Sequence, residues 1–361
     1  MGWKKTSIVL DDGTMVDAQA PLIVSVSRST DIPAFYADWF FDRLNKGYSA
    51  WTNPFNGKKS YISYENTRFI VFWSKNPEPL IPYLDKLSEH SPKINCYIQY
   101  TLNDYVEEDL EKAVPNLDQR IKTFKTLVNK LGKGHVIWRF DPLILSDSIT
   151  IVDLLNKIEY IGDRLLGYTD KLVFSFADIE SYLKVKRNLI QNNVHYIDWT
   201  EEQMKYFSSK LSDLNRRKCW NYVLSTCCEK DIFQEFGIQP NSCIDENLII
   251  SIAWNDNVLM NFLGVDIHSK KIPISLFDDN DNIPEGALLL NDEEHYAVKH
   301  KNNKDKGQRS LCGCITSKDI GEYNTCPHQC EYCYANTSKH IAISNWKRHK
   351  MNPHSDSITG K

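Results

Sequence analysis

The chain has 361 residues, 42% of them hydrophobic, so it can bury a large core as one big domain or two ordinary ones. A formal net charge of −4 argues against a protein that coats nucleic acid. The sequence has no apolar run of the roughly 18 residues that a membrane span needs, and its polar N-terminus lacks the apolar core of a signal peptide. We therefore expect a cytoplasmic protein without a membrane partner.

Between residues 20 and 230, short apolar runs alternate with helical patterns. Branched and aromatic content predicts seven buried strands, at 22–27, 48–53, 68–74, 96–101, 135–140, 171–176 and 222–226. Helical periodicity predicts helices at 33–46, 117–131, 148–166, 178–191 and 200–214. Pro33 suits a first helical turn, with Asp31 or Thr30 as its cap. Repeated strand–helix units predict a parallel sheet with crossover helices.

The fold class expected from this pattern is α/β, with a (β/α)8-like, TIM-type parallel barrel. An eighth strand at 314–320 completes the count. An open doubly wound sheet would satisfy the same pattern, but the first turn lacks G-x-G-x-x-G, so dinucleotide binding has no specific support. Because a barrel closes on itself, strand 314–320 should pair with strand 22–27.

Three regions are expected along the chain. Residues 1–230 form the main barrel, and residues 231–311 form an insertion with helices at 229–236 and 243–253 and a polar loop at 278–282. Residues 312–361 supply the last strand, a cysteine-rich loop and a helix from Ser338, whose polar end we expect to fray.

The cysteine-rich loop carries Cys326, Cys330 and Cys333 at C-x3-C-x2-C spacing. Five of the ten cysteines fall between Cys312 and Cys333, which indicates metal ligands in a reducing compartment rather than disulfides. Three thiolates can hold one iron–sulfur cube and leave its fourth iron without a protein ligand, free to bind a small molecule. The alternative is three of the four ligands of a zinc knuckle.

Four further cysteines are candidates for a second metal site: Cys227, Cys243, Cys312 and Cys314. Four thiolates would saturate an auxiliary [4Fe–4S] cluster or a structural zinc site. Cys228 is the alternative to Cys227, because neighbours on a strand point to opposite sides. The other interpretation treats these cysteines as small buried hydrophobic residues.

Polar residues follow the carboxyl ends of most predicted strands, where a parallel barrel places its active site. Ordinary loop capping and ion pairing is the alternative for each. The candidates are Ser27, Arg28, Thr30, Asp31, Asn53, Lys75, Asn76, Gln99, Thr101, Arg139, Asp141, Ser175 and Asp178. Arg139 stands inside an apolar strand, where a buried charge needs an anionic ligand or a carboxylate such as Asp141 or Asp31. We expect Arg139, Asp31 and Lys75 to serve catalysis.

The run from Tyr323 to Ala335 resembles the radical S-adenosylmethionine (SAM) enzymes, especially the branch that contains spore photoproduct lyase. The chain as a whole resembles the bacterial family called domain of unknown function 1848. The matching segments are 27–36, 53–56, 72–77, 138–142 and 312–335, with small departures at Ser29 and Ser74.

The resemblance implies that the cysteine loop binds a [4Fe–4S] cluster and that SAM chelates the open iron. One electron, from a reductant such as flavodoxin or ferredoxin, would then cleave SAM to methionine and a 5′-deoxyadenosyl radical. Because radical SAM barrels usually place this loop after their first strand, the resemblance implies a circular permutation here. It places Ser27, Arg28, Thr30 and Asn53 around the cofactor, with Tyr332 and Tyr334 packed on the adenine or shielding the cluster.

Two other functions stay open beside a radical SAM enzyme with an unidentified small-molecule substrate. The first is repair or modification of a nucleic acid, for which the basic stretches 216–218, 299–309 and 347–350 would contact phosphates. The second is a non-catalytic binding protein whose cysteines hold zinc.

Overall fold

The structure is a computed structural model that describes residues 3–53, 56–270 and 283–360. The predicted polar loop at 278–282 lies outside the described residues. The chain divides into two compact units, one formed by Met1–Asn241 with Lys318–Lys361 and the other by Ser242–Ser317. Within the described ranges, no helix is long and apolar enough to cross a membrane.

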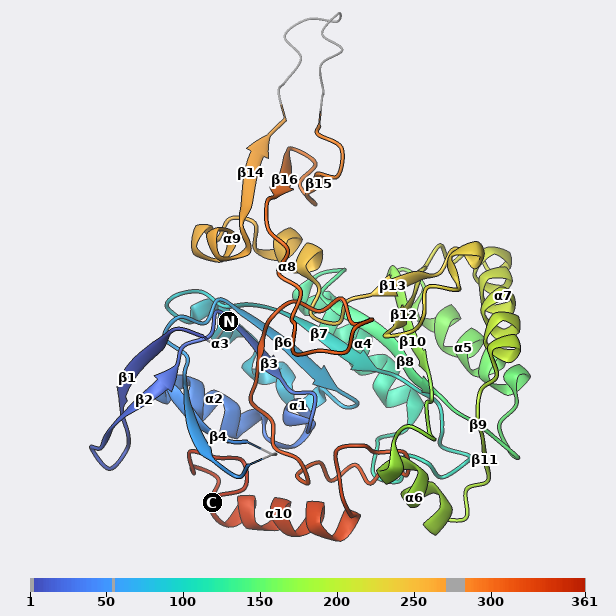
Figure 1. The fold of residues 1–361 in the computed structure, drawn as a ribbon, viewed down its shortest axis with the longest axis horizontal. Helices are drawn as coiled ribbons and strands as arrows, with labels where there is room; N and C mark the ends of the chain where they lie inside the picture. Colours follow the sequence, from blue (N-terminus) through green and yellow to red (C-terminus); the bar gives the residue numbers. More distant parts are fainter. Residues whose placement is uncertain (1–2, 54–55, 271–282, 361) are drawn as a thin grey trace, which may run out of the picture. The chain divides into compact units, whose positions relative to one another are not determined.

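The first unit is built on an eight-stranded sheet whose neighbouring strands are all parallel (Figure 1). Its order is β13 (Gln239–Asn241), β12 (Val223–Cys227), β10 (Lys171–Phe176), β8 (Val136–Leu143), β7 (Asn95–Thr101), β6 (Phe69–Ser74), β3 (Ile23–Val26) and β17 (Lys318–Asp319). The central strands are buried almost throughout, which explains their continuous apolar runs.

The predicted pairing between the last strand and the first is confirmed. Lys318 lies opposite Val24 and Asp319 lies opposite Ser25, although β17 is much shorter than the expected strand. A parallel α/β sheet is therefore present. In the part of the chain that the structure describes, no strand pairing joins β13 to β17, so a closed barrel is not found.

One predicted barrel strand belongs to a different sheet. β4 (Tyr48–Thr52) pairs antiparallel with β5 (Lys59–Ser63), in a four-stranded sheet completed by β1 (Lys5–Val9) and β2 (Met15–Gln19). An apolar run identifies a strand but not its partner, and a hairpin partner seven residues away is the easier one to reach. The eighth place in the parallel sheet is taken by the short polar strand β13.

The predicted helix at 33–46 is two helices, α1 (Ile32–Phe35) and α2 (Ala37–Lys46). Asp31 caps α1 as expected, accepting a hydrogen bond from the Ala34 N–H at 3.0 Å. Tyr36 interrupts the helix with a φ of −137°, and its hydroxyl donates to the Thr325 carbonyl at 2.6 Å. A tertiary contact to the cysteine loop thus accompanies the break.

The longer predicted helices are confirmed. Thr150 and Thr200 close capping boxes at the starts of α5 and α7. The helices and short elements of this region are η1 (Glu78–Tyr83), α3 (Asp85–Glu89), α4 (Leu117–Leu131), β9 (Leu145–Ser146), α5 (Ile151–Leu165), α6 (Leu183–Gln191), β11 (Tyr196–Ile197) and α7 (Glu201–Arg217). The predicted helix at 229–236 is wrong: only a 3₁₀ turn, η2 (Gln234–Phe236), forms before Gly237.

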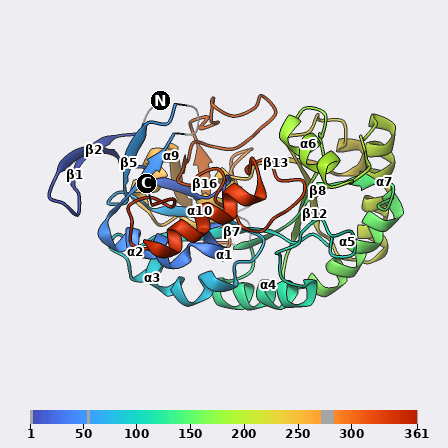
Figure 2. The same ribbon diagram turned by 90° about the horizontal axis from the view of Figure 1, so that it is seen from below.

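The C-terminal segment packs on the first helices of the chain. Figure 2 shows α10 (Lys339–Met351) beside α1 and α2. The ring centroids of Trp346 and Phe35 are 5.9 Å apart, and the Trp39 indole N–H donates to the Ser355 carbonyl at 2.8 Å. The described part of the tail that we expected to fray is therefore packed, with Ile358 only 1% exposed.

The second unit contains α8 (Glu246–Ala253), α9 (Asn257–Leu263) and a small antiparallel sheet. α8 confirms most of the helix predicted at 243–253, with Asp245 as its cap. The sheet order is β14 (Val265–Ser269), β16 (His295–Lys299) and β15 (Leu288–Leu289).

Candidate functional site

The three cysteines lie in a loop, residues 321–337, that directly follows β17; we call it the cysteine loop. β17 and β3 are parallel neighbours, so the cysteine loop starts beside the turn that follows β3. The Asp319 carboxylate joins the two segments. Its Oδ2 accepts from the Arg28 N–H at 2.8 Å, and its Oδ1 accepts from the Ser27 hydroxyl at 2.9 Å and the Gly321 N–H at 2.9 Å.

Gly321 begins the cysteine loop where the two segments come closest. A Cβ atom at this position would lie 1.7 Å from Ser27 Oγ and 2.7 Å from Ser29 Oγ. These distances are far below van der Waals contact, so any side chain would push the loop away from the β3 turn. Glycine is required here because the loop backbone packs directly against the side chains of Ser27 and Ser29.

Of the three cysteines of the loop, Cys330 is buried, and Cys326 and Cys333 are partly buried. Burial is the largest cause that raises the pKa of each thiol. The pKa of Cys330 is raised further by Glu111, Cys333 and Cys326, and that of Cys326 by Asp31 and Cys333. The three cysteines share one loop, which starts beside the turn that follows β3.

Among the described residues, no group of three or more His, Cys, Asp or Glu side chains is already arranged as a metal site. The chemistry of the donor set still fits an iron–sulfur group, since it offers three soft sulfur donors inside one loop. Metal binding deprotonates a coordinating thiol, so the raised pKa of the metal-free thiols does not oppose ligation.

Asp31 holds the cysteine loop against the carboxyl ends of β3 and β6. Its Oδ2 accepts from the His328 Nε2 at 2.8 Å and from the Lys75 N–H at 2.7 Å, and its Oδ1 accepts from the Ser74 hydroxyl at 2.7 Å. The other ring nitrogen of His328, Nδ1, lies 3.2 Å from the Ala113 carbonyl. His328 therefore shapes the loop between Cys326 and Cys330.

Lys75 lies in a buried polar cluster beside Cys330. Its ammonium donates to Glu111 Oε1 at 2.7 Å and to the Tyr332 hydroxyl at 2.9 Å. The Tyr332 hydroxyl also donates to Glu111, and the same hydroxyl accepts a hydrogen bond from Asn103 Nδ2 at 3.1 Å. Burial lowers the pKa of Lys75, but the charges of Glu111 and Cys330 outweigh burial and raise it overall. The ammonium thus supplies positive charge next to a predicted ligand.

Glu111 balances two cations, the buried Arg120 and the largely buried Lys75. Its Oε2 lies 3.7 Å from Arg120 Nη1, and both side chains are 1% exposed. Burial would raise the pKa of Glu111, but Lys75 and Arg120 hold it at about 2 against a usual 4.5. Glu111 also pairs through its backbone with Cys330, so the charge cluster and the cysteine loop are one connected structure.

Arg139 is buried in β8 and paired with Asp141, as the sequence suggested. Its Nη1 donates to Gln99 Oε1 at 3.3 Å, and the Ser175 hydroxyl donates to Asp141. The Arg139 guanidinium also lies 5.5 Å from the centroid of the Trp73 ring, which the Arg28 guanidinium approaches at 5.6 Å. Two guanidinium groups therefore meet one indole at the carboxyl end of the sheet.

The remaining predicted cofactor residues lie in different surroundings. Thr30 is buried, and its hydroxyl has no hydrogen-bond partner in the described part of the chain. Tyr332 is buried with its hydroxyl held in the Glu111 cluster, whereas Tyr334 is 45% exposed and donates to the Arg28 carbonyl at 2.5 Å. Asn53 follows β4 of the antiparallel sheet and lines a cavity together with Glu322 and Tyr323 at the start of the cysteine loop.

Three of the four cysteines predicted for a second metal site lie in the second unit. Cys243, Cys312 and Cys314 are all buried there. The segments of Cys243 and Cys314 are adjacent, because the Ile244 N–H lies 3.3 Å from Cys314 Sγ. Cys227 ends β12 in the first unit.

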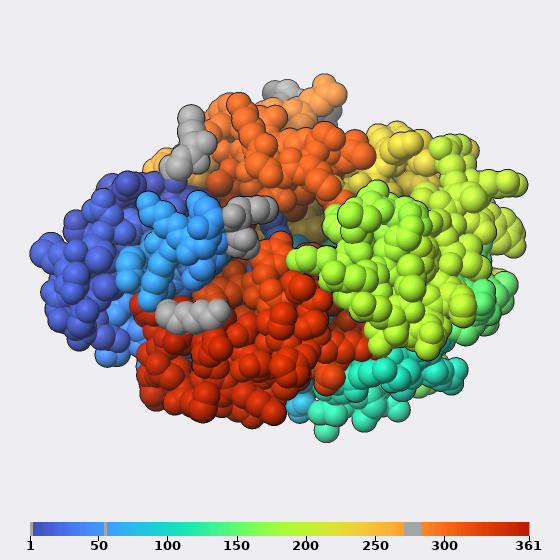
Figure 3. All heavy atoms as spheres, turned by 60° about the horizontal axis from the view of Figure 1, so that its bottom comes forward, coloured from blue at the N-terminus to red at the C-terminus, as the bar shows by residue number. Residues whose placement is uncertain are grey.

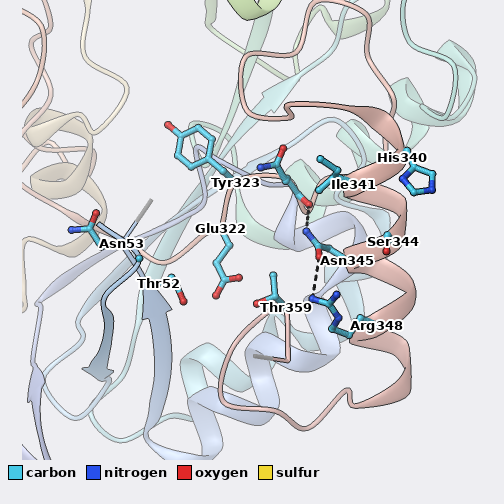
Figure 4. A pocket seen from close by; sticks show the side chains of 12 residues that line it. Thr52, Asn53, Glu322, Tyr323, His340, Ile341, Ser344, Asn345, Arg348 and Thr359 are labelled. Atoms are coloured by element: carbon cyan, nitrogen blue, oxygen red, sulfur yellow. Dashed lines mark hydrogen bonds between the residues drawn. The ribbon is translucent and has the colours of Figure 1, made fainter. Parts of the chain in front are cut away.

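A polar cavity of about 600 Å³ lies between the end of β4, the start of the cysteine loop and α10 (Figure 4). The described lining includes Glu322, Tyr323, Asn324, Asn345 and Arg348. Asn345 connects the loop to the helix, donating to the Asn324 carbonyl at 2.9 Å and accepting from Arg348 at 3.4 Å. Small-molecule sites commonly have roughly this size, about 300–1,000 Å³.

Sequence reasoning missed four residues that hold this region together: Asn103, Glu111, Asp319 and Gly321. Asn103 and Glu111 belong to a loop without periodic pattern, and their partners are distant in sequence. Asp319 was inside the predicted last strand, two residues before a glycine. That spacing was the one available signal of a tight approach.

No curated protein and no solved structure matches the chain. The model of one family, described as Domain of unknown function (DUF1848), matches residues 23–335. This span starts at β3 and ends at Ala335, so it includes the whole parallel sheet and the three cysteines of the loop. The chain therefore belongs to the DUF1848 family.

Proposed function

We propose that the protein is a radical SAM enzyme in which Cys326, Cys330 and Cys333 hold a [4Fe–4S] cluster. The observation that carries the proposal is one loop, fixed to the carboxyl end of the parallel sheet by Asp319 and His328, that holds three cysteines at buried or partly buried positions. Three thiolates leave one iron of such a cluster open to another ligand. When bound, the cluster and SAM would supply one-electron cleavage to methionine and a 5′-deoxyadenosyl radical that takes hydrogen from a substrate.

The chain's own residues would position and protect this chemistry. Asp31 and His328 orient the loop between two ligands, and Asp319 fixes its start against the β3 turn. The Lys75 ammonium offsets negative charge that thiolates bring to a buried place. Arg139 and Asp141 form the polar floor at the ends of β8 and β10, where a substrate would lie.

We also propose that the parallel sheet is a circularly permuted radical SAM barrel related to the spore photoproduct lyase branch. In this proposal β17 takes the place of the first strand, since it directly precedes the cysteine loop. The parallel pairing of β17 with β3 supports the idea.

Anaerobic reconstitution with iron and sulfide tests the cluster. We expect a brown protein with visible sulfur-to-iron charge-transfer absorption, and iron content will distinguish one cluster from two. Incubation of the dithionite-reduced protein with SAM should yield 5′-deoxyadenosine. A colourless protein with stoichiometric zinc would instead support the non-catalytic binding protein.

Two cysteine variants sharpen the test. Cys330→Ala should lose the cluster and the 5′-deoxyadenosine, whereas Cys219→Ala, which changes an exposed cysteine outside the loop, should keep both. A Cys330→Ala protein that still forms 5′-deoxyadenosine at the wild-type rate would refute the ligand assignment.

A further inference from the structure

Helix α6 carries apolar side chains on its outward face. Val185 and Leu189 are buried, while Leu183, Arg187 and Ile190 recur at helical spacing on the opposite side. Leu183 is 77% exposed and Ile190 is 56% exposed. Such a face normally carries polar residues on a surface helix, so the exposed leucine and isoleucine add apolar surface on either side of an arginine.

The cysteine loop extends this surface with aromatic rings. The ring centroids of Tyr182 and Tyr334 are 6.4 Å apart, and the Lys184 ammonium lies 5.6 Å from the ring centroid of Tyr323. Figure 3 shows the light-green segment that contains α6 beside the red segment that contains the cysteine loop. We call Tyr182, Leu183, Lys184, Arg187, Ile190 and Tyr334 the α6 patch.

The charge of the α6 patch is positive. Within the described ranges, neither Lys184 nor Arg187 has a carboxylate partner, and Arg187 donates only to the Thr337 carbonyl, at 3.4 Å. The neighbouring Lys186 differs, because Glu180 pairs with it at 2.6 Å. Apolar and aromatic groups next to unpaired cations suit a partner with an acidic rim.

The α6 patch also adjoins a predicted cluster ligand. Asn188 Nδ2 on α6 donates to the Cys333 carbonyl at 3.5 Å, and the next residue in the chain is the exposed Tyr334. Asp31, Glu111 and Tyr332, which also lie near the cysteines, are buried, whereas Cys333 itself is partly exposed. Electron tunnelling weakens steeply with distance, so an external donor should dock where the ligand loop reaches the surface.

We propose that the α6 patch docks a small acidic electron-carrier protein of the flavodoxin or ferredoxin type. The inference rests on the proposed function, because it assumes a cluster on the cysteine loop. The reduced carrier gives up one electron and becomes oxidised by one electron, the cluster gains that electron, and no atom is transferred. Such encounters need only a small, weakly bound interface steered by charge.

The test uses the reconstituted holoprotein, flavodoxin as the probe and two double variants. Leu183→Glu with Arg187→Glu reverses the α6 patch. Val152→Glu with Lys210→Glu makes the same change in net charge at exposed positions on α5 and α7. Flavodoxin binding is measured by titration calorimetry, and 5′-deoxyadenosine formation is measured with reduced flavodoxin and, separately, with dithionite.

We expect the α6 variant to lose roughly tenfold or more in flavodoxin affinity and in the flavodoxin-driven rate, because charge at an interface rim controls association. Its dithionite-driven rate should equal that of wild type, and the control variant should be unchanged in every assay. Higher salt should weaken flavodoxin binding to the wild-type protein.

Three outcomes would overturn the docking proposal. Unchanged flavodoxin binding in the α6 variant places the docking surface elsewhere. An equal loss of the dithionite-driven rate shows damage to the site itself. Loss of binding to a single-stranded oligonucleotide, with flavodoxin binding intact, assigns the patch to nucleic acid. A wild-type protein that forms no 5′-deoxyadenosine even with dithionite refutes the proposed function, which separates that failure from a failure of docking.

Discussion

Removal of the Glu111 charge should destabilise the first unit more than any surface ion pair does. Glu111 Oε1 accepts from Lys75 and Tyr332, and Oε2 faces Arg120. Glu111→Gln keeps the shape of the side chain but leaves the buried Arg120 and the largely buried Lys75 without their counter-charge. Removing one partner of a buried ion pair typically costs about 3–5 kcal/mol. We expect the free energy of unfolding to fall by that amount.

The matched control makes the same substitution in a surface pair. Glu159 accepts a hydrogen bond from the Lys218 ammonium, also at 2.7 Å, but both of these side chains are about one-third exposed. Solvent screens this pair, so Glu159→Gln should change the free energy of unfolding by less than about 1 kcal/mol. Because the two glutamates have similar distances to their lysine partners, the difference between the two variants measures the effect of burial.

The assay is urea unfolding followed by tryptophan fluorescence and by far-ultraviolet circular dichroism, with Lys75→Met added to Glu111→Gln as the third variant. The double variant removes one of the two stranded cations, so it should be more stable than Glu111→Gln alone. If Glu111→Gln lies within about 1 kcal/mol of wild type, the Glu111 cluster is not a desolvated ion network and the reasoning fails.

Three further predictions concern the cysteine loop and β17. Gly321→Ala should cost about 1–3 kcal/mol by overpacking against Ser27 Oγ, and unfolding within 0.5 kcal/mol of wild type would contradict the close approach. Asp31→Asn should lower the free energy of unfolding by about 3 kcal/mol and reduce iron retention after reconstitution, because the loop loses the charged acceptor for His328. Full iron retention in this variant would contradict a role for Asp31 in holding the loop. Burial lowers the pKa of Lys318 to about 8 from a usual 10.5. Between pH 8 and 10.5 the unfolded chain binds more protons than the folded chain, so the free energy of unfolding should rise with pH across this window. Lys318→Met should abolish the rise. Identical pH profiles of unfolding for the wild-type protein and Lys318→Met would contradict this assignment.

Local pattern determined most of the elements of the first unit. Strands β3, β6, β7, β8, β10 and β12 and helices α4, α5 and α7 follow directly from apolar runs, helical periods and threonine caps. Such signals act over a few residues, and burial on both faces of a parallel sheet makes the runs unmistakable. The pairing of the last strand with the first was expected from barrel closure, and it forms although the described strands do not close into a barrel.

The partners of these elements were decided by tertiary structure. The run at β4 contains aromatic residues and predicts a strand, but it pairs with the nearby β5 in another sheet, and the polar β13 joins the parallel sheet instead. Strand identity depends on the residues of the strand itself, whereas strand pairing depends on which edge is free when the chain folds.

The candidate site shows the same division. The spacing of Cys326, Cys330 and Cys333 could be seen in the sequence, as could the unusual position of Arg139 in an apolar strand. Glu111 and Asp319 could not, because Lys75, which pairs with Glu111, and Ser27, which donates to Asp319, are both more than thirty residues away from them in the sequence. A carboxylate in a loop becomes part of a site only when burial removes water and leaves other side chains to balance its charge, and only the folded chain decides where that happens.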